Sequence, residues 1–133
     1  ADPILTVACH CLDCQKLSAS AFSVTALVPT EGFALLGSTP VERSLPGSLR
    51  HHFFCPSCKT WLFTRMQGVE ARLNIRPMLF DLAAWWQPFF ETMIRHKQPW
   101  VSLSVAHSFD GFPDPDGVPH LIGQFAKSRT FSR

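Results

Sequence analysis

The 133-residue sequence lacks both a long apolar run and a strong charge of either sign. Its longest purely apolar stretches, such as LAAWW at 82–86, fall far short of the roughly 20 residues that span a bilayer. The formal net charge is only +2, and the Lys and Arg residues are scattered, which argues against a nucleic-acid-binding surface. We therefore expect neither a membrane nor a nucleic acid as a partner.

The sequence also lacks the signals of a secreted, disulfide-linked protein. Its first residues, ADPILTVA, have neither a basic flank nor a long apolar stretch. Five cysteines is an odd number, so a full disulfide framework would leave one thiol over. A chain of this length buries roughly two thirds of its unfolded surface and folds without cross-links. We expect one cytoplasmic domain over 1–133, with reduced thiols that bind a metal.

Short segments that alternate apolar and polar residues, separated by turn signals, predict a mainly β, antiparallel domain. The expected strands are 21–28, 33–37, 49–54, 61–66, 69–75, 91–95 and 100–106. One helix of two to three turns is expected at 77–86, because Pro77 suits the first helical position and Pro88 ends the segment. The tail, rich in Asp, Gly and Pro, predicts loop with a short strand near HLIGQF at 120–125.

The downstream cysteines, Cys55 and Cys58, form a C-x-x-C pair in the segment FFCPSCKTW. This spacing is typical of a zinc knuckle, in which a short turn points both sulfurs at one ion. A redox pair is the alternative, but such pairs usually open a helix after a strand, and KTWLFTRM looks extended. Metal binding is therefore the preferred interpretation over a redox pair or two bystander thiols.

Three further thiols, Cys9, Cys11 and Cys14, fall within six positions. A structural zinc site has four protein ligands, whereas a catalytic one has three and keeps a position open. In one arrangement Cys11, Cys14, Cys55 and Cys58 form a closed site and Cys9 is spare. In the other, Cys9, Cys11 and Cys14 hold an open zinc, and Cys55 and Cys58 belong to a second site. Spacing alone slightly favours the closed site.

Three segments together resemble one known family: CHCLDCQKLSASAFS at 9–23, RHHFFCPSCKTWLF at 50–63 and KQPWVSL at 97–103. They are similar to the glutathione-dependent formaldehyde-activating enzymes, which are S-(hydroxymethyl)glutathione synthase-like proteins with a zinc-binding β-tent fold. The resemblance covers about residues 5–105. It implies a β-tent-like antiparallel domain, an open catalytic zinc on Cys9, Cys11 and Cys14, and half of a structural zinc site on Cys55 and Cys58.

The sequence departs from the family pattern at several positions. The family completes its structural site with a Cys-x-Cys pair nearer the N-terminus, which this chain lacks, so we expect a domain without that strand or a rebuilt site. Lys59 and Ala19 stand where the family usually has glycine, and Glu91 stands where it commonly has histidine. Lys59 is expected either to carry a left-handed strain of about 1 kcal/mol or to adopt another turn.

The resemblance implies a zinc-dependent carbon–sulfur lyase that acts on an adduct of glutathione, or another small thiol, with formaldehyde or a related aldehyde. Gln15, Lys16, Ser18 and Ser20 follow the trio closely and are candidates for holding glutathione, with Lys16 as the charged anchor; a solvated polar turn is the alternative. The other functional hypothesis is a non-catalytic zinc-binding structural or protein-interaction module. A methionine sulfoxide reductase-like enzyme is set aside, because no cysteine follows Cys58.

Overall fold

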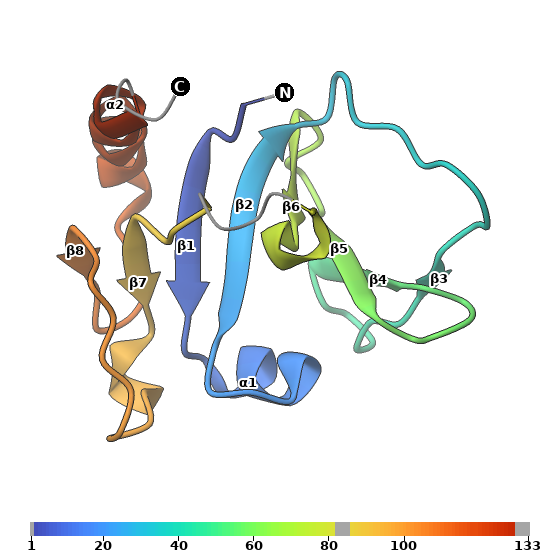
Figure 1. The fold of residues 1–133 in the computed structure, drawn as a ribbon, viewed down its shortest axis with the longest axis horizontal. Helices are drawn as coiled ribbons and strands as arrows, with labels where there is room; N and C mark the ends of the chain where they lie inside the picture. The colour runs from blue at the N-terminus through green and yellow to red at the C-terminus, as the bar shows by residue number, and fades with distance from the viewer. Residues whose placement is uncertain (1, 82–85, 130–133) are drawn as a thin grey trace.

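The computed structural model describes residues 2–81 and 86–129 and folds them around one eight-stranded sheet (Figure 1). The strand order is β3-β4-β5-β6-β2-β1-β7-β8. The strands are β1 (Leu5–Cys9), β2 (Ser23–Pro29), β3 (Val41–Glu42), β4 (Arg50–Phe54), β5 (Trp61–Met66), β6 (Arg72–Ile75), β7 (Phe90–Thr92) and β8 (His107–Ser108). The helices are α1 (Leu12–Ser18) and α2 (Val118–Ser128), with 3-10 turns η1 (Pro77–Leu79), η3 (Ile94–His96) and η4 (Pro115–Gly117).

The centre of the sheet is the antiparallel pair β1 and β2, joined by α1. All five residues of β1 are buried, and the register pairs Leu5 with Leu27 and Cys9 with Ser23. On its other side β2 pairs with β6, so β1 and β2 are interior strands with both edges covered. Figure 1 shows α1 at the end of the sheet where β1 stops and β2 begins. This position brings the residues after Cys9 back over the end of the sheet.

The expectation of a purely antiparallel sheet is wrong at one edge. β7 pairs with β1 in parallel, with Ala8 opposite Glu91, and β8 pairs with β7 in parallel as well. Parallel neighbours need long crossover connections, and here the chain passes through β2 to β6 before it returns as β7. The domain is therefore a mixed α/β structure with a mixed sheet.

Several expected strands are confirmed and others are wrong. β2, β4 and β5 lie within one or two residues of the expected bounds, and β6 and β7 occupy the ends of the expected 69–75 and 91–95. Segments 33–37 and 100–106 pair with no strand of the described sheet. The side chains of Leu36 and Trp100 are 92% and 76% exposed, so these apolar residues face solvent instead of a sheet face.

The helix predictions are also corrected. At 77–86 only the turn η1 forms before Phe80 returns to extended backbone, and residues 82–85 lie outside the described part. Met78, Leu79 and Phe80 are each about half exposed, so residues 78–80 contribute no buried side chain that would support a longer helix. The strand expected near 120–125 is instead part of α2. Leu121 and Phe125, four residues apart, form the buried stripe of an amphipathic helix.

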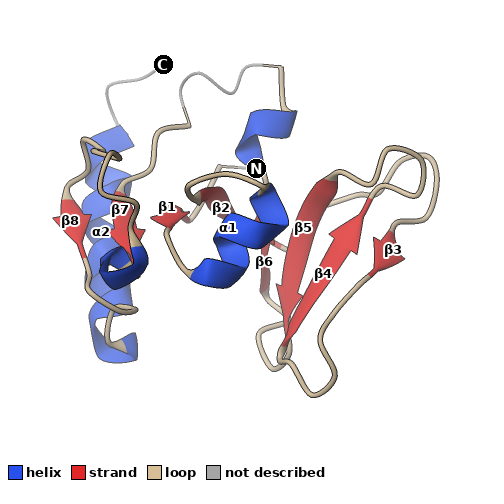
Figure 2. Ribbon diagram, turned by 90° about the horizontal axis from the view of Figure 1, so that it is seen from below, coloured by secondary structure: helices blue, strands red, loops and turns tan. Residues whose placement is uncertain are grey.

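The core consists of two clusters on opposite faces of the sheet. Adjacent residues of a strand point to opposite faces, and in β2 Ala26 belongs to one cluster while Leu27 packs against the other. The second cluster includes Leu121 and Phe125 of α2, which lies behind β7 and β8 in Figure 2. Each fully buried Leu, Ile, Val or Phe side chain contributes about 1.5–3 kcal/mol to the stability of the fold. No helix in the described ranges combines the length and the apolar character needed to cross a membrane.

Candidate metal centre

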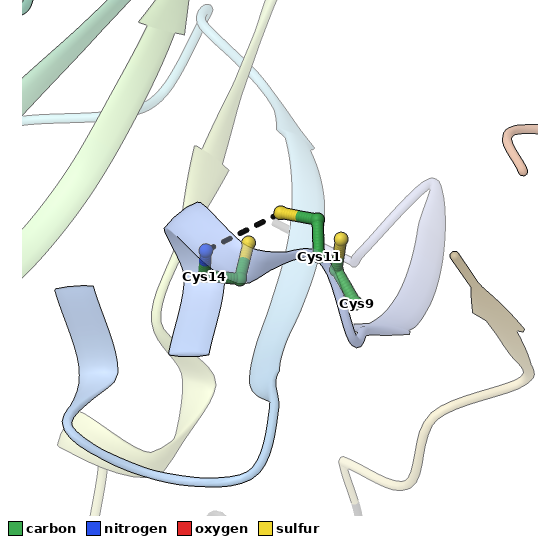
Figure 3. Close-up of side chains that lie close together, drawn as sticks. All are labelled: Cys9, Cys11 and Cys14. Atoms are coloured by element: carbon green, nitrogen blue, oxygen red, sulfur yellow. Dashed lines mark hydrogen bonds between the residues drawn. The ribbon is translucent and has the colours of Figure 1, made fainter. Parts of the chain in front are cut away.

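The thiols of Cys9, Cys11 and Cys14, called the trio below, gather where β1 passes into α1 (Figure 3). Their three Sγ atoms lie within 4.8 Å of one another. Cys9 is the last residue of β1, Cys11 is the N-cap of α1, and Cys14 lies in the first turn of that helix. Cys9 and Cys11 are each only 8% exposed, and Cys14 is half-buried. The trio is thus a mostly buried group of three sulfurs.

The local backbone explains how the sulfurs meet. Cys11 is extended (φ −60°, ψ 154°), and its sulfur accepts a hydrogen bond from the Cys14 backbone N–H at 3.3 Å, which is the place usually taken by a Ser or Asp oxygen. The helix ends at Ala19, whose left-handed backbone (φ 50°) closes the last turn. The short helix therefore folds Cys14 back toward Cys9 and Cys11, and the capping sulfur itself belongs to the site.

The donor set fits a zinc ion. Zinc bonds thiolate sulfur at about 2.3 Å in tetrahedral geometry, which places neighbouring sulfurs about 3.8 Å apart. Three sulfurs within 4.8 Å reach that spacing with small side-chain movements. Thiolates are soft ligands that suit zinc, and three of them leave one coordination position open. The trio can therefore hold a metal ion such as zinc.

The thiols perturb one another strongly. Hydrogen bonds from Cys11 and Cys14 lower the pKa of Cys9 well below its ordinary value, although burial opposes the shift. The pKa of Cys14 is raised, because its hydrogen bonds with Cys11 and Cys9 favour the protonated form and burial adds to the effect. The opposite shifts disfavour ionisation of all three thiols together, because adjacent thiolates repel each other. A bound divalent cation would remove that repulsion.

Cys55 and Cys58 do not join the trio. They lie in the tight turn between β4 and β5, which is closed by hydrogen bonds from the Cys55 backbone N–H to the Thr60 oxygen (2.8 Å) and from Lys59 N–H to the Cys55 oxygen (3.0 Å). Cys55 is half-buried and Cys58 is exposed. No described ligand group combines these thiols with the trio, so the closed four-thiolate site is not assembled here. Their role as half of a structural zinc site remains a prediction.

Lys59 adopts the left-handed backbone expected where the family usually has glycine. Its φ is 65°, and Ala19, at the other such position, has φ 50°. A residue with a Cβ is strained there by about 1–2 kcal/mol. Of the two possibilities considered for Lys59, the structure has the strained turn.

Two of the four predicted glutathione-binding residues use their polar groups inside the protein. The Gln15 Nε2 donates to the backbone oxygens of His10 (2.7 Å) and His96 (2.9 Å), and its Oε1 accepts from Gln98 Nε2 (3.0 Å). The Ser18 hydroxyl donates to the Cys14 backbone oxygen at 2.7 Å. Gln15 therefore ties α1 to the segment after η3, and Ser18 stabilises the helix that carries Cys14.

The other two, Lys16 and Ser20, are exposed beside a shallow depression of about 480 Å³. The depression is also lined by Leu12, Gln98 and the exposed Trp100. It combines one cation, hydroxyl and amide groups and an aromatic face. These groups come from α1 and its C-terminal end and from the KQPW segment, two regions about eighty residues apart in the sequence.

Two charged residues lie near the trio; Arg76 was missed in the sequence, and Glu91 was noted only as a departure from the family pattern. Glu91 of β7 is 1% exposed; its Oε1 lies 3.1 Å from Lys97 Nζ and 3.3 Å from His10 Nε2. Burial lowers the pKa of His10, although Glu91 opposes the shift. Arg76 follows β6 and reaches across to β2. No spacing rule marks either residue as part of a site, and the strand pairing is what brings them there.

Comparison with known proteins gives one family and no curated relative. A search of curated proteins found no match. The family profile described as "Glutathione-dependent formaldehyde-activating enzyme" matches residues 1–96. This range is more than half of the chain and includes the trio, α1 and the turn with Cys55 and Cys58. The chain therefore belongs to the glutathione-dependent formaldehyde-activating enzyme family.

Proposed function

We propose that this protein is a zinc-dependent carbon–sulfur lyase of the S-(hydroxymethyl)glutathione synthase type. Its substrate would be an adduct of glutathione, or of another small thiol, with formaldehyde or a related aldehyde. The observation that carries the proposal is the convergence of Cys9, Cys11 and Cys14, with sulfurs within 4.8 Å, in a chain of this family. Three ligands and an open position are the arrangement of catalytic zinc sites.

In the synthetic direction, the thiol sulfur of glutathione bonds to the carbonyl carbon of formaldehyde. The thiol proton passes to the carbonyl oxygen as the C=O double bond opens, which gives the S-hydroxymethyl adduct; the lyase direction reverses both changes. When bound by the trio, zinc supplies an open position that favours the thiolate form of an incoming thiol. Cys9, Cys11 and Cys14 would hold the ion where β1 ends and α1 begins.

The depression beside α1 suits the rest of the thiol substrate. Lys16 presents an ammonium group that can pair with a glutathione carboxylate, and Ser20 and Gln98 offer hydrogen bonds to its amides. Trp100 offers a flat apolar face along the same side. Gln15 and Ser18 act in this proposal as positioning residues. Gln15 ties α1 to His96 and to Gln98 of the KQPW segment, and Ser18 bonds the backbone oxygen of Cys14 within α1.

The proposal is tested by zinc analysis combined with turnover. Adduct formation is followed by NMR exchange between free and thiol-bound formaldehyde, with the spontaneous rate subtracted. Cys9→Ser is expected to lose the trio's zinc and the rate enhancement, while Cys58→Ser, at the exposed turn, keeps the rate enhancement. An unchanged zinc content in Cys9→Ser contradicts the proposal.

A second measurement tests the depression. Lys16→Gln is expected to raise the KM for glutathione several-fold with little change in kcat, because the ammonium group contacts only the non-reacting part of the substrate. A loss confined to kcat would place Lys16 outside substrate binding.

One observation favours the alternative of a non-catalytic zinc module. Gln15 and Ser18 donate hydrogen bonds to backbone oxygens of the protein itself. Half of the predicted substrate-binding residues therefore have a structural role. A protein that binds zinc through the trio but shows no rate above the spontaneous reaction would be such a module.

A further inference from the structure

A row of polar side chains crosses the face of the sheet that carries Cys9. Cross-strand partners in a sheet share a face, and the register pairs Cys9 with Ser23 and His52 with Thr64. Thr25 lies two residues after Ser23 and therefore points to the same face. Arg76, the residue after Ile75, continues the register of β6 opposite Thr25, because Ile75 pairs with Ala26. This row connects the trio to the β4–β5 hairpin.

Arg76 is held by contacts from two strands, β2 and β5. Its Nη1 donates to the Thr25 hydroxyl at 2.6 Å, and its Nη2 donates to the Thr64 hydroxyl at 3.2 Å. Its guanidinium lies over the ring of Trp61, 3.5 Å from the ring centre. Such a cation–π contact is stronger when it is desolvated than when it is exposed. The guanidinium therefore has one defined position.

The Thr64 hydroxyl fixes the neighbouring groups as well. It receives hydrogen bonds from two obligate donors, Arg76 Nη2 and Trp61 Nε1 (3.1 Å), which occupy both of its acceptor sites. Its own proton is then donated to His52 Nδ1 at 2.8 Å, which requires a neutral His52. Burial and the charge of Arg76 lower the pKa of His52, in agreement with that assignment. Arg76 is thus the cation of this network.

No carboxylate among the described residues forms an ion pair with Arg76. Its polar partners are the hydroxyls of Thr25 and Thr64 and the backbone oxygen of Val24, and its Nε is buried without a hydrogen bond. A buried cation normally needs a nearby anion. Burial lowers the pKa of Arg76 to about 10, and the charges of Cys14 and Cys9 oppose that shift. The thiols of the trio lie on the same face, because Cys9 pairs with Ser23, two residues from the Thr25 that binds Arg76, and they are the ionisable groups of this face that can supply the anion.

We propose that Arg76 is a positioning residue that supplies the fixed countercharge of the trio and strengthens its binding of zinc. This inference rests on the zinc site of the proposed function. Three thiolates around a divalent ion leave one net negative charge, which the single positive charge of Arg76 offsets. The charge is present before the metal arrives, so the three sulfurs can ionise at a lower cost.

The test is a competition titration of zinc against a chromophoric chelator at fixed pH and ionic strength. Arg76→Met keeps much of the length and apolar stem but removes the charge, and is expected to weaken zinc binding by roughly 10- to 100-fold, the range found for residues that support metal ligands. Arg76→Lys is expected to recover most of that loss, because it retains the charge. Arg72→Met, at the first residue of β6, is the matched control and should bind zinc as the wild type does.

Cobalt titration gives a second readout, because thiolate-to-cobalt absorption reports the number of sulfur ligands. The Arg76→Met protein should show the wild-type cobalt spectrum at saturation, with more cobalt needed to reach it. Equal weakening in Arg76→Lys and Arg76→Met would overturn the proposal, since it would assign Arg76 a purely structural role. Wild-type zinc affinity in Arg76→Met would overturn it as well.

Thr25→Val provides a variant that leaves the charge in place. It removes only the 2.6 Å hydrogen bond to Nη1, so its zinc affinity should fall by less than that of Arg76→Met. An equal or larger fall would contradict a role for the charge. A wild-type protein that binds zinc through the trio but does not accelerate adduct formation refutes the proposed function alone, and the Arg76 comparison still decides this inference.

Discussion

The two C-x-x-C segments have the same spacing and very different surroundings. Cys11 and Cys14 lie at the start of a helix, where the first sulfur accepts the backbone N–H of the second residue, and Cys9 joins them from the end of an interior strand. Cys55 and Cys58 lie in an exposed turn that no third described ligand approaches. The spacing alone therefore specifies neither the burial nor the number of sulfurs in a site. The neighbouring strands decide both.

The two regions are also supported differently. Beneath the trio, the Glu91 carboxylate is buried between His10 and Lys97. On the outer side of β4, Glu42 pairs with His51 at 2.6 Å in an exposed position. A buried charge that loses its partner costs far more than an exposed one. The region of the trio should therefore depend strongly on Glu91, whereas the β4–β5 hairpin should depend little on Glu42.

The largest effect is expected for Glu91→Gln. Loss of this carboxylate leaves Lys97 and buried His10 without their charged partner and should lower the free energy of unfolding by about 3 kcal/mol, at the low end for a buried pair because Lys97 is a quarter exposed. Urea unfolding of the two proteins measures the difference. Glu42→Gln is the control and should unfold close to the wild type, and equal destabilisation by both changes would remove the contrast between the two regions.

A smaller effect, of opposite sign, is expected at the two strained residues. Lys59 in the exposed turn and Ala19 at the end of α1 both have left-handed backbones, which glycine adopts without strain. Lys59→Gly and Ala19→Gly should each raise the unfolding free energy by up to about 1 kcal/mol. Ala34→Gly, at a residue without positive φ, should lower it. Destabilisation by Lys59→Gly would mean that the Lys59 side chain contributes more than the strain costs.

The smallest effect concerns pH and two adjacent histidines of β4. Glu42 raises the pKa of His51, whereas burial and Arg76 lower the pKa of His52. The His51 contribution to stability is present at low pH and is lost as pH rises through its raised pKa. The His52 contribution is lost as pH falls, because the unfolded chain takes up that proton first. NMR titration of the two rings measures both values.

Two variants separate the effect of Glu42 on the His51 pKa from the effect of Arg76 on the His52 pKa. Glu42→Gln should bring the His51 pKa down toward the ordinary value without moving His52, and Arg76→Met should raise the His52 pKa without moving His51. Titration of both rings at the same pH would contradict the assignment of His52 to the network of Thr64 and Arg76.

Local features of the fold could be predicted from the sequence. The alternating segments gave β2, β4 and β5 within a few residues, because their patterns are determined by one buried face. The position of the usual glycine indicated that Lys59 has either a left-handed backbone or another turn, and the structure has the first. The proximity of Cys9, Cys11 and Cys14 also required only local geometry, since five residues and one turn of helix bring them together.

Features that depend on distant pairing could not be predicted. Nothing in the segment PFFET indicates that β7 pairs in parallel with β1 and buries Glu91 against His10, because the partners are about eighty residues apart. Arg76 carries no motif, and its role depends on Thr25 and Thr64 of two other strands. The short apolar segment HLIGQF fits a strand or a helix. Only the face formed by β1 and β7 selects the helix α2.

The most direct test of the trio as an open site is X-ray absorption spectroscopy at the zinc edge of the protein loaded with one zinc per chain. Three sulfur neighbours at about 2.3 Å and one lighter neighbour are expected for zinc held by Cys9, Cys11 and Cys14. Addition of glutathione should replace the lighter neighbour with a fourth sulfur. A four-sulfur shell before glutathione is added would contradict the open site and would require Cys55 or Cys58 to reach the same ion.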